Sequence, residues 1–314
     1  MRVEELDETA LLARVLPLMP TRALLGPGDD AALVAAPDGR VVATTDVLVE
    51  LRDFRRDWST GADVGWKAVA QNVADVAAMG ATCTGLLLAL GMPGDLEVAW
   101  VEDFARGVAQ ACAEFGAVVV GGDLSAASEI VVAVTALGDL AGAPPVLRSG
   151  ARAGHVVAVA GTLGRSGAGL DLLQRGVLDG PADLLGAHRR PVPPVAAGPR
   201  ARRAGASALM DVSDGLLRDA GRIAAASGVT LDLSTTSALG GWIADLLPAV
   251  GGRATELVLT GGEDHALLGC FPPDAGLPAP FAAVGVVRPA GPHPVLVDGR
   301  AWAGAGTGWD HFAQ

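Results

Sequence analysis

The sequence repeatedly places aspartate or glutamate beside glycine or threonine after an apolar run. Five clusters follow this pattern, at residues 26–30 (GPGDD), 42–46 (VATTD), 119–123 (VVGGD), 209–215 (LMDVSDG) and 259–264 (LTGGED). Carboxylates at the ends of strands can converge on one cleft, and glycine lets the backbone approach a ligand. Asp and Gly also favour turns, so any one cluster alone indicates no more than a turn. Five in one chain favour a shared site for a hard cation such as Mg²⁺ beside substrate phosphates.

A helix predicted over residues 63–79 adds a sixth acidic position. Lys67, Gln71, Asn72 and Asp75 fall at i, i+4, i+5 and i+8 and share one side of this helix. A polar stripe of this kind is ordinarily a solvated face. Short amide and carboxylate groups are also suited to binding a ligand, so the pattern leaves both interpretations open.

Residues 211–215 follow a predicted strand and precede a predicted helix, so Ser213 or Asp214 is expected to be the N-cap. Capping does not require Asp211 as well. Two carboxylates three residues apart at a helix start can hold a metal or a metal-bound phosphate near free N–H groups. The glycine-rich segment 164–169 is a second helix start that could approach an anion, but it lacks the lysine of a P-loop.

Other catalytic patterns are absent from the sequence. The five histidines, at positions 155, 188, 265, 293 and 311, occur singly, without the spacing of a zinc site. Neither a nucleophile elbow nor a dinucleotide fingerprint occurs. Acid-rich, glycine-rich segments that suit Mg²⁺ favour phosphoryl transfer, in which catalysis is mostly positioning and charge neutralisation.

Composition excludes several classes of protein. The chain has 314 residues, of which 50% are hydrophobic and 18% are charged, and a net charge of −12. So apolar a chain is expected to fold, and its acidity argues against a nucleic-acid partner or an anionic membrane surface. The uncharged stretch between Asp75 and Asp95 is interrupted by Gly and Pro, so no membrane span is expected.

The predicted location is the cytoplasm. Cys83, Cys112 and Cys270 have neither the number nor the spacing of a disulfide framework or a zinc knuckle. The first residues are acidic where an export signal would be basic and then apolar.

The predicted elements indicate an α+β or mixed α/β fold, because strands and helices do not alternate strictly. Strands are predicted at 41–45, 86–90, 118–120, 130–137, 155–160, 208–210 and 257–259, and helices at 4–16, 63–79, 96–115, 167–175 and 216–226. The Gly/Pro-rich stretch 141–145 is the candidate linker. We therefore expect one domain over residues 1–145 and a second over residues 146–314.

The motifs, taken in order, resemble those of thiamine-monophosphate kinases. The matching segments are 26–32 (GPGDDAA), 44–46 (TTD), Asn72 with 79–81 (MGA), 121–123 (GGD), 148–150 (RSG), 211–215 (DVSDG), 261–264 (GGED) and 308–312 (GWDHF). Each motif is short, but together they cover nearly the whole chain.

The resemblance implies transfer of the γ-phosphate of ATP to thiamine phosphate, giving thiamine diphosphate and ADP. It also implies the two-domain fold shared with aminoimidazole ribonucleotide synthetase. In that fold an N-terminal domain binds ATP and Mg²⁺ and pairs in a homodimer to form a β-barrel, and the C-terminal domain is α+β. The acceptor is already a phosphate oxyanion, so no catalytic base is expected.

The resemblance also assigns residues. It implies Mg²⁺ ligation by Asp30, Thr44, Thr45, Asp46, Asp75, Asp123, Asp211 and Asp214. It implies ATP contacts from Gly122, Asp123, Arg148 and Ser213, and substrate contacts from Glu263 and Trp309.

One position departs from the family pattern. Asp53 stands where the family usually has a histidine that contacts the substrate, and it could pair with the cationic thiazolium. Two other interpretations therefore stay open. The chain could be another ATP-dependent member of the superfamily, with aminoimidazole ribonucleotide synthetase the best alternative. It could also bind nucleotide or thiamine phosphate without turnover.

Overall fold

The computed structural model describes residues 1–19, 24 and 34–309. The predicted ligand Asp30 lies outside the described residues. The chain forms two compact units. Unit 1 comprises Met1–Val76 and Ala81–Ala143, and unit 2 comprises Ala77–Gly80 and the chain from Pro144 onward.

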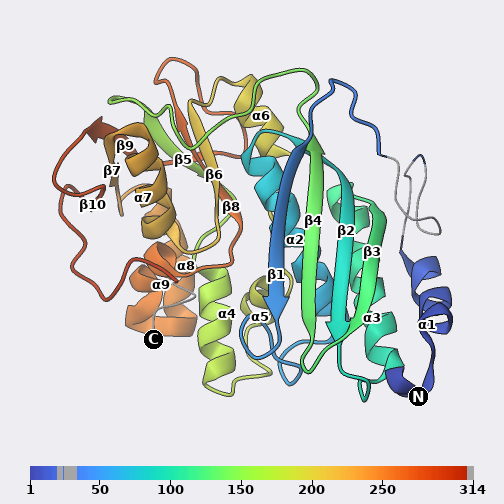
Figure 1. The fold of residues 1–314 in the computed structure, drawn as a ribbon. Helices are drawn as coiled ribbons and strands as arrows, with labels where there is room; N and C mark the ends of the chain where they lie inside the picture. Colours follow the sequence, from blue (N-terminus) through green and yellow to red (C-terminus); the bar gives the residue numbers. More distant parts are fainter. Residues whose placement is uncertain (20–23, 25–33, 310–314) are drawn as a thin grey trace. The chain divides into compact units, whose positions relative to one another are not determined.

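Unit 1 is built on a four-stranded sheet with the strand order β1-β4-β2-β3. Strand β4 is antiparallel to both β1 and β2, whereas β2 and β3 are parallel. Figure 1 shows α2 and α3 on one face of this sheet. The elements are η1 (Val3–Glu5), α1 (Glu8–Val15), η2 (Leu16–Leu18), β1 (Val42–Val49), α2 (Gly61–Ala78), β2 (Thr82–Met92), α3 (Val98–Phe115), β3 (Val119–Ala126) and β4 (Val131–Asp139).

The two faces of this sheet differ in exposure. Leu86, Leu88 and Leu90 of β2 are buried, whereas Leu87 between them is 38% exposed. Val47 of β1 is 49% exposed. Successive strand residues point to opposite faces, so the buried residues pack beneath the helices and the others form an open face. This open face carries apolar side chains.

Glycine allows α2 and α3 to pack closely. A Cβ atom at Gly107 of α3 would lie 2.0 Å from the carbonyl oxygen of Ala62 in α2. At Gly65 of α2 it would lie 2.2 Å from the carbonyl oxygen of Phe104. Any larger residue would force the helices apart. These contacts set the position of α2, and therefore of Asp75.

Unit 2 is built on a six-stranded sheet with the order β10-β7-β9-β5-β8-β6. Neighbouring strands are antiparallel except β10 and β7, which are parallel. The strands are β5 (Val156–Ala160), β6 (Ala208–Val212), β7 (Val229–Leu233), β8 (Ala266–Phe271), β9 (Ala282–Pro289) and β10 (Val295–Val297). The helices are α4 (Arg165–Gln174), α5 (Ala182–Arg189), α6 (Ala197–Arg203), α7 (Leu216–Ser227), α8 (Ala238–Val250), η3 (Gly251–Arg253) and α9 (Ala254–Thr260).

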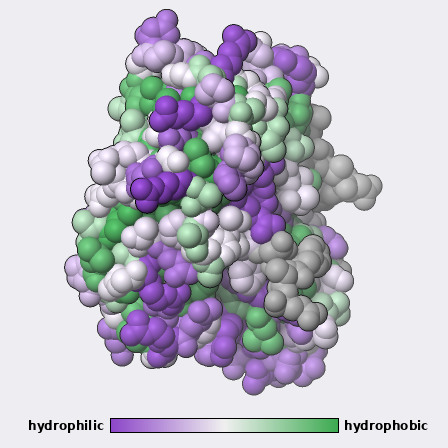
Figure 2. Space-filling model, turned by 90° about the vertical axis from the view of Figure 1, so that its left-hand side faces the viewer, coloured by the Kyte–Doolittle hydropathy of each residue, from purple (hydrophilic) through white to green (hydrophobic). Residues whose placement is uncertain are grey.

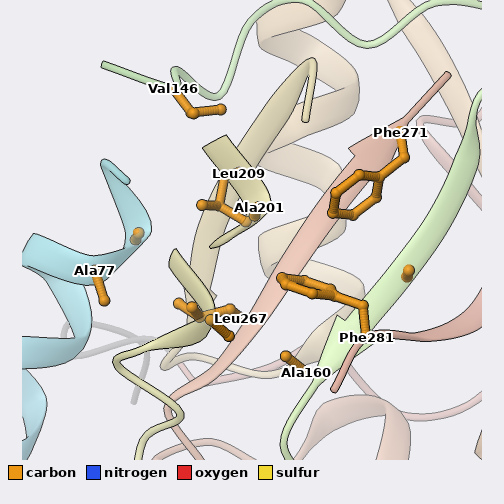
Figure 3. Packing of buried hydrophobic residues seen from close by; sticks show 11 residues of the cluster. Ala77, Val146, Ala160, Ala201, Leu209, Leu267, Phe271 and Phe281 are labelled. Atoms are coloured by element: carbon orange, nitrogen blue, oxygen red, sulfur yellow. The ribbon is translucent and has the colours of Figure 1, made fainter. Parts of the chain in front are cut away.

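Part of the unit 2 core is a cluster of small and aromatic side chains (Figure 3). The rings of Phe271 and Phe281 meet edge to face with their centroids 5.0 Å apart. Leu209 of β6 and Leu267 of β8 belong to the same cluster. Packing of this kind makes β6 and β8 rigid, and these two strands border the loops that carry predicted site residues of unit 2.

The fold is mixed α+β, as predicted, but three local predictions are wrong. Residues 257–259, predicted as a strand, lie in α9, because a short apolar run is equally compatible with a buried helix. Asp46 and Asp123 do not lie at strand ends. β1 continues to Val49 through a run with β propensity, and β3 continues to Ala126 because it pairs with β2 along that length.

The surface gives two further facts. No helix among residues 1–19, 24 and 34–309 is long and apolar enough to cross a membrane. Hydrophilic and hydrophobic residues are interspersed on the face shown in Figure 2, which is typical of a surface in contact with water.

Candidate active site

In unit 1, strand β1 and helix α2 bring two predicted metal ligands together. The hydroxyl of Thr44 donates a hydrogen bond of 2.7 Å to Oδ2 of Asp75. Asp46 lies two residues further along β1 and so shares the face of Thr44. Thr45 lies on the open face, and its hydroxyl donates to the carbonyl oxygen of Val134 at 2.9 Å. The pairing of β1 with β4 therefore sets where each of these side chains points.

Gly122 and Asp123 lie on β3, at the other edge of the same sheet. A Cβ atom at Gly122 would lie 2.0 Å from the carbonyl oxygen of Leu88, so only glycine fits there. Asp123 pairs with Ala89 and is exposed. Two strands separate β1 from β3, which places Asp46 and Asp123 roughly 14 Å apart at a strand spacing of about 4.8 Å. One copy of unit 1 does not bring these two carboxylates together.

The polar stripe of α2 is not a solvated face. Lys67, Gln71 and Asn72 are 3%, 8% and 0% exposed. Asn72 donates from Nδ2 to the carbonyl oxygen of Ala68 at 2.9 Å. Burial of these polar groups decides against the solvated interpretation that the sequence left open.

Asp53 lies in the loop after β1, where it stabilises the turn. Its Oδ2 atom accepts the N–H of Val49 at 2.8 Å, and Lys67 Nζ donates to its carbonyl oxygen at 3.3 Å. Leu51 in the same loop has φ of +67°, which is uncommon for a residue other than glycine. These bonds hold the loop in a conformation that it would otherwise not favour.

In unit 2, two other segments of the chain contact residues 212–214 through backbone hydrogen bonds. The N–H groups of Glu263 and His265 donate to the carbonyl oxygens of Ser213 and Val212 at 2.7 and 2.9 Å. The N–H of Trp309 donates to the carbonyl oxygen of Asp214 at 2.8 Å. Unit 2 therefore brings together the predicted residues of three separate motifs. Asp211, at the end of β6, is 4% exposed and lies 3.4 Å from His265 Nδ1.

The start of α7 is not capped by Ser213 or Asp214. The N-cap is Gly215, with φ of +111°, and the N–H groups of Ser213 and Asp214 donate to Oδ2 of Asp219 at 3.1 and 3.0 Å. Burial raises the pKa of Asp219 to about 7, with a further contribution from the negative charge of Asp211. Arg222 contacts Asp214 Oδ2 and Asp219 Oδ1, each at 2.5 Å. A carboxylate inside the helix thus replaces the expected cap.

The N–H groups at the glycine-rich start of α4 also donate to a side chain of the protein. Asp264 accepts the N–H of Gly164 at 2.6 Å and that of Ser166 at 2.9 Å. Burial raises the pKa of Asp264 to about 7 although these bonds favour the ionised form. The anion at this helix start is a side chain of the protein itself.

Arg148 is not part of this convergence in unit 2. Its side chain is exposed, and its carbonyl oxygen accepts the hydroxyl of Ser227 at 3.1 Å. Ser227 ends α7, whereas Asp214 precedes the start of that helix. Twelve helical residues separate the two ends by about 18 Å.

The predicted ligands suit Mg²⁺ in their chemistry. Each offers carboxylate or hydroxyl oxygen, the donors that Mg²⁺ prefers. Asp214 already attracts a cation, because Arg222 contacts its carboxylate. Among the described residues, however, no group of three or more His, Cys, Asp or Glu side chains lies close enough together to hold a metal ion.

Sequence reasoning missed the residues that support the site. The position of Asp219 could have been noticed in the sequence, because an acidic residue there interrupts the apolar face of α7 between Leu216 and Ala220. Arg222 has no such signal, since its role depends on a contact eight residues back with Asp214. His188 also had none, because its neighbours come from distant segments.

Comparison with known proteins identifies the family to which this chain belongs. Residues 28–140 match the family model described as AIR synthase related protein, N-terminal domain. The thiamine-monophosphate kinase of Mycobacterium tuberculosis is 46% identical over 321 residues, which cover 99% of this chain and 93% of that protein. The chain belongs to the thiamine-monophosphate kinase family, and it is a phosphotransferase.

Solved structures agree with this assignment. AaThiL complexed with AMPPCP and TMP superposes with a TM-score of 0.78 at 34% identity, over 99% of both chains. The thiamine-monophosphate kinase from Stenotrophomonas maltophilia K279a gives a TM-score of 0.79 at 32% identity, over 94% of this chain and 96% of that one.

Proposed function

We propose that this chain transfers the γ-phosphate of ATP to thiamine monophosphate, giving thiamine diphosphate and ADP. The observation that carries the proposal is the 46% identity with a thiamine-monophosphate kinase along almost the whole of both chains. A solved relative of similar fold binds TMP together with AMPPCP, an ATP analogue.

The proposed site keeps the residues predicted from the sequence. Metal ligation is assigned to Asp30, Thr44, Thr45, Asp46, Asp75, Asp123, Asp211 and Asp214. ATP contacts are assigned to Gly122, Asp123, Arg148 and Ser213, and substrate contacts to Asp53, Glu263 and Trp309. Bound Mg²⁺ would neutralise the phosphate charges that otherwise repel each other.

The protein's own contribution is to hold these groups in place. Asp219 fixes the backbone of Ser213 and Asp214 through two N–H bonds, so the direction of the Asp214 side chain is set before any ligand arrives. Thr44 limits the rotation of Asp75 in the same way. Arg222 balances the charge of Asp214.

We further propose that the working form is a homodimer in which the partner completes the site. Asp46 and Asp123 lie on opposite edge strands of one sheet, so a single copy leaves each without the other. Pairing two open, apolar sheet faces would bury Val47 and Leu87 and produce the barrel predicted from the family. If the two-fold axis runs along the barrel, β1 of one copy lies beside β3 of the other, and this is the arrangement that we propose.

The remaining assignments follow from these proposals. Unit 1 would carry the dimer contact and most of the Mg²⁺ ligands. The proposed boundary between the N-terminal domain and the C-terminal α+β domain stays between residues 145 and 146. A cytoplasmic location stays a prediction from the cysteines and the acidic first residues.

A direct assay tests the reaction. Purified protein is given ATP and Mg²⁺ with thiamine monophosphate, with thiamine, or with aminoimidazole precursors in parallel. We expect thiamine diphosphate and ADP from the first acceptor alone. Absence of thiamine diphosphate would refute the proposal, and turnover of an aminoimidazole precursor would favour the synthetase alternative.

Complementation tests the shared site. Asp46→Asn and Asp123→Asn should each abolish turnover, because each removes one predicted ligand. Mixed dimers of the two variants contain one site with both aspartates intact. Random reassociation should therefore restore about a quarter of the wild-type rate, since half of the dimers have one intact site. No recovery, with mixed dimers demonstrated by mass, would place both aspartates in the same subunit's site.

A further inference from the structure

The side chain of His188, in the last turn of α5, is buried against two groups of the unit 2 site. His188 is 4% exposed. Its Nδ1 atom lies 3.3 Å from Oε2 of Glu263 and 3.3 Å from the hydroxyl of Ser166. The Glu263 side chain is 31% exposed, so the carboxylate reaches from the buried imidazole to the surface of the site.

Close packing of two helices fixes the position of this imidazole. A Cβ atom at Gly169 of α4 would lie 2.2 Å from the carbonyl oxygen of Leu184 and 2.9 Å from Cβ of His188. Only glycine therefore allows α5 to approach α4 this closely. His188 is held by the helix packing, whereas Glu263 is carried by a loop.

The backbone of Glu263 is held in an unfavourable conformation. Its φ is +63°, in the left-handed region that residues other than glycine rarely adopt. The bond from its N–H to Ser213 and the two bonds that Asp264 accepts on the next residue keep it there. Strain of this kind persists only where the surroundings impose it, and it is frequent at binding sites. With the backbone fixed, the rotation of the side chain decides where the carboxylate points.

The contact with His188 restricts that rotation. An ionised carboxylate accepts hydrogen bonds and donates none, so the proton on the facing imidazole nitrogen belongs on Nδ1. Nδ1–H then faces two acceptors at 3.3 Å, Oε2 of Glu263 and the hydroxyl of Ser166, and we assign its bond to the ionised carboxylate. The bond is charge-assisted, which makes it stronger than one between neutral groups.

We propose that His188 is a positioning residue that directs the Glu263 carboxylate toward the thiazolium ring of the acceptor. The proposal rests on the proposed function, which assigns Glu263 to the substrate. The thiazolium nitrogen carries a positive charge but no hydrogen, so it cannot orient a carboxylate by donating a bond. The protein must supply that orientation, and His188 does so from the buried side.

Equilibrium binding and kinetics test the proposal together. Thiamine monophosphate is titrated calorimetrically into protein that holds AMPPCP and Mg²⁺, and KM is measured for both substrates. His188→Leu removes the donor at similar volume, and we expect binding of thiamine monophosphate about ten-fold weaker, with KM for ATP unchanged. His188→Asn places an amide N–H near the position of Nδ1 and should restore most of the affinity.

A double-mutant cycle separates this role from a general structural one. Glu263→Gln should weaken binding by itself, and His188→Leu should add little in that background because it acts through the lost carboxylate. Additive effects, or a His188→Leu variant that binds like wild type while Glu263→Gln is impaired, would overturn the role of His188 alone. Wild-type binding by Glu263→Gln would instead overturn the substrate contact in the proposed function.

A second variant covers the case in which His188→Leu does not fold. His188→Gln keeps a polar side chain, but its amide reaches the position of Nε2 and leaves Glu263 without its donor. We expect the same ten-fold loss, within a factor of about three. Wild-type affinity in a folded His188→Gln variant would also overturn the proposal.

Discussion

The two units hold their candidate ligands by different means. In unit 1 all the described candidate ligands except Asp75 of α2 lie within strands, and the register of β1, β4, β2 and β3 determines which side chain faces which side. In unit 2 Asp211 ends strand β6, and Ser213 and Asp214 lie on the following loop, where the buried carboxylate of Asp219 holds their N–H groups; Asp264 holds the loop at the start of α4 in the same way. The loops of unit 2 are thus fixed within one copy, whereas the ligands of unit 1 are divided between two edges of a sheet.

This difference indicates how the candidate ligands of each unit can be disrupted. Strand register tolerates the loss of one side-chain contact, because many backbone bonds maintain it. A loop held by one carboxylate loses several bonds when that group is removed. Conversely, unit 2 needs no partner to bring Ser213, Glu263 and Trp309 together, whereas the proposed dimer is what would bring Asp46 to Asp123.

The largest expected effect comes from a charge on the open face of unit 1. Val47→Arg should leave each copy folded, because the side chain is half exposed, but it should prevent dimer formation and abolish turnover. Sedimentation velocity gives the mass, and circular dichroism confirms the fold. Val192→Arg, at a position 63% exposed in unit 2, is the matched control and should stay dimeric and active. A dimeric Val47→Arg protein would show that this face is not the contact.

Removal of the carboxylate in α7 should have the next largest effect. Asp219→Ala leaves two N–H groups and Arg222 without their acceptor, and we expect a loss of about 3 kcal/mol in the free energy of unfolding. Urea denaturation measures it. Thr44→Val in unit 1 removes one hydrogen bond to Asp75 and should cost about 1 kcal/mol. Equal losses in the two variants would remove the contrast between the units.

A further expected effect is a dependence on pH. The pKa of Asp264 is about 7 when folded, above its ordinary value of 3.8, so the folded chain binds the proton more tightly than the unfolded chain. The contribution to stability is therefore complete below about pH 4 and is lost as pH rises toward 7, by at most about 1.4 kcal/mol per pH unit. Asp264→Asn cannot titrate and should show a flatter profile in urea denaturation at pH 5 and pH 7. The same slope in both proteins would assign the titration to another group.

Sequence patterns predicted the elements with long periodic segments. Helices α2, α3 and α7 and strands β2, β4 and β5 all overlap their predicted ranges, because burial of one face or of a whole strand leaves a regular apolar pattern. Strand β8 (Ala266–Phe271) was missed although it is buried throughout, since an apolar run that includes glycine carries no period. Helix α8 is apolar nearly all round and gave no amphipathic signal.

The candidate site was predictable in residue type but not in geometry. Aspartates in glycine-rich motifs predict which groups could bind a metal, and the burial of Asn72 and Lys67 shows that the polar stripe of α2 is not a solvated face. That Asp46 and Asp123 lie on opposite edges depends on strand order, which pairs segments far apart in the sequence. The role of His188 depends on packing between helices and loops, for which local sequence holds no information, whereas Asp219 stands out only as an acidic residue on the apolar face of α7.

Lys67 gives the chain a built-in chemical label. It is the only lysine in the sequence, it is 3% exposed, and its Nζ atom donates to the carbonyl oxygen of Asp53. An acylating reagent has therefore one side-chain amine to modify, and it reaches that amine only when α2 and the loop after β1 separate. The rate of acylation at Lys67 therefore measures how often α2 and the proposed substrate loop separate. No engineered probe is needed for this measurement.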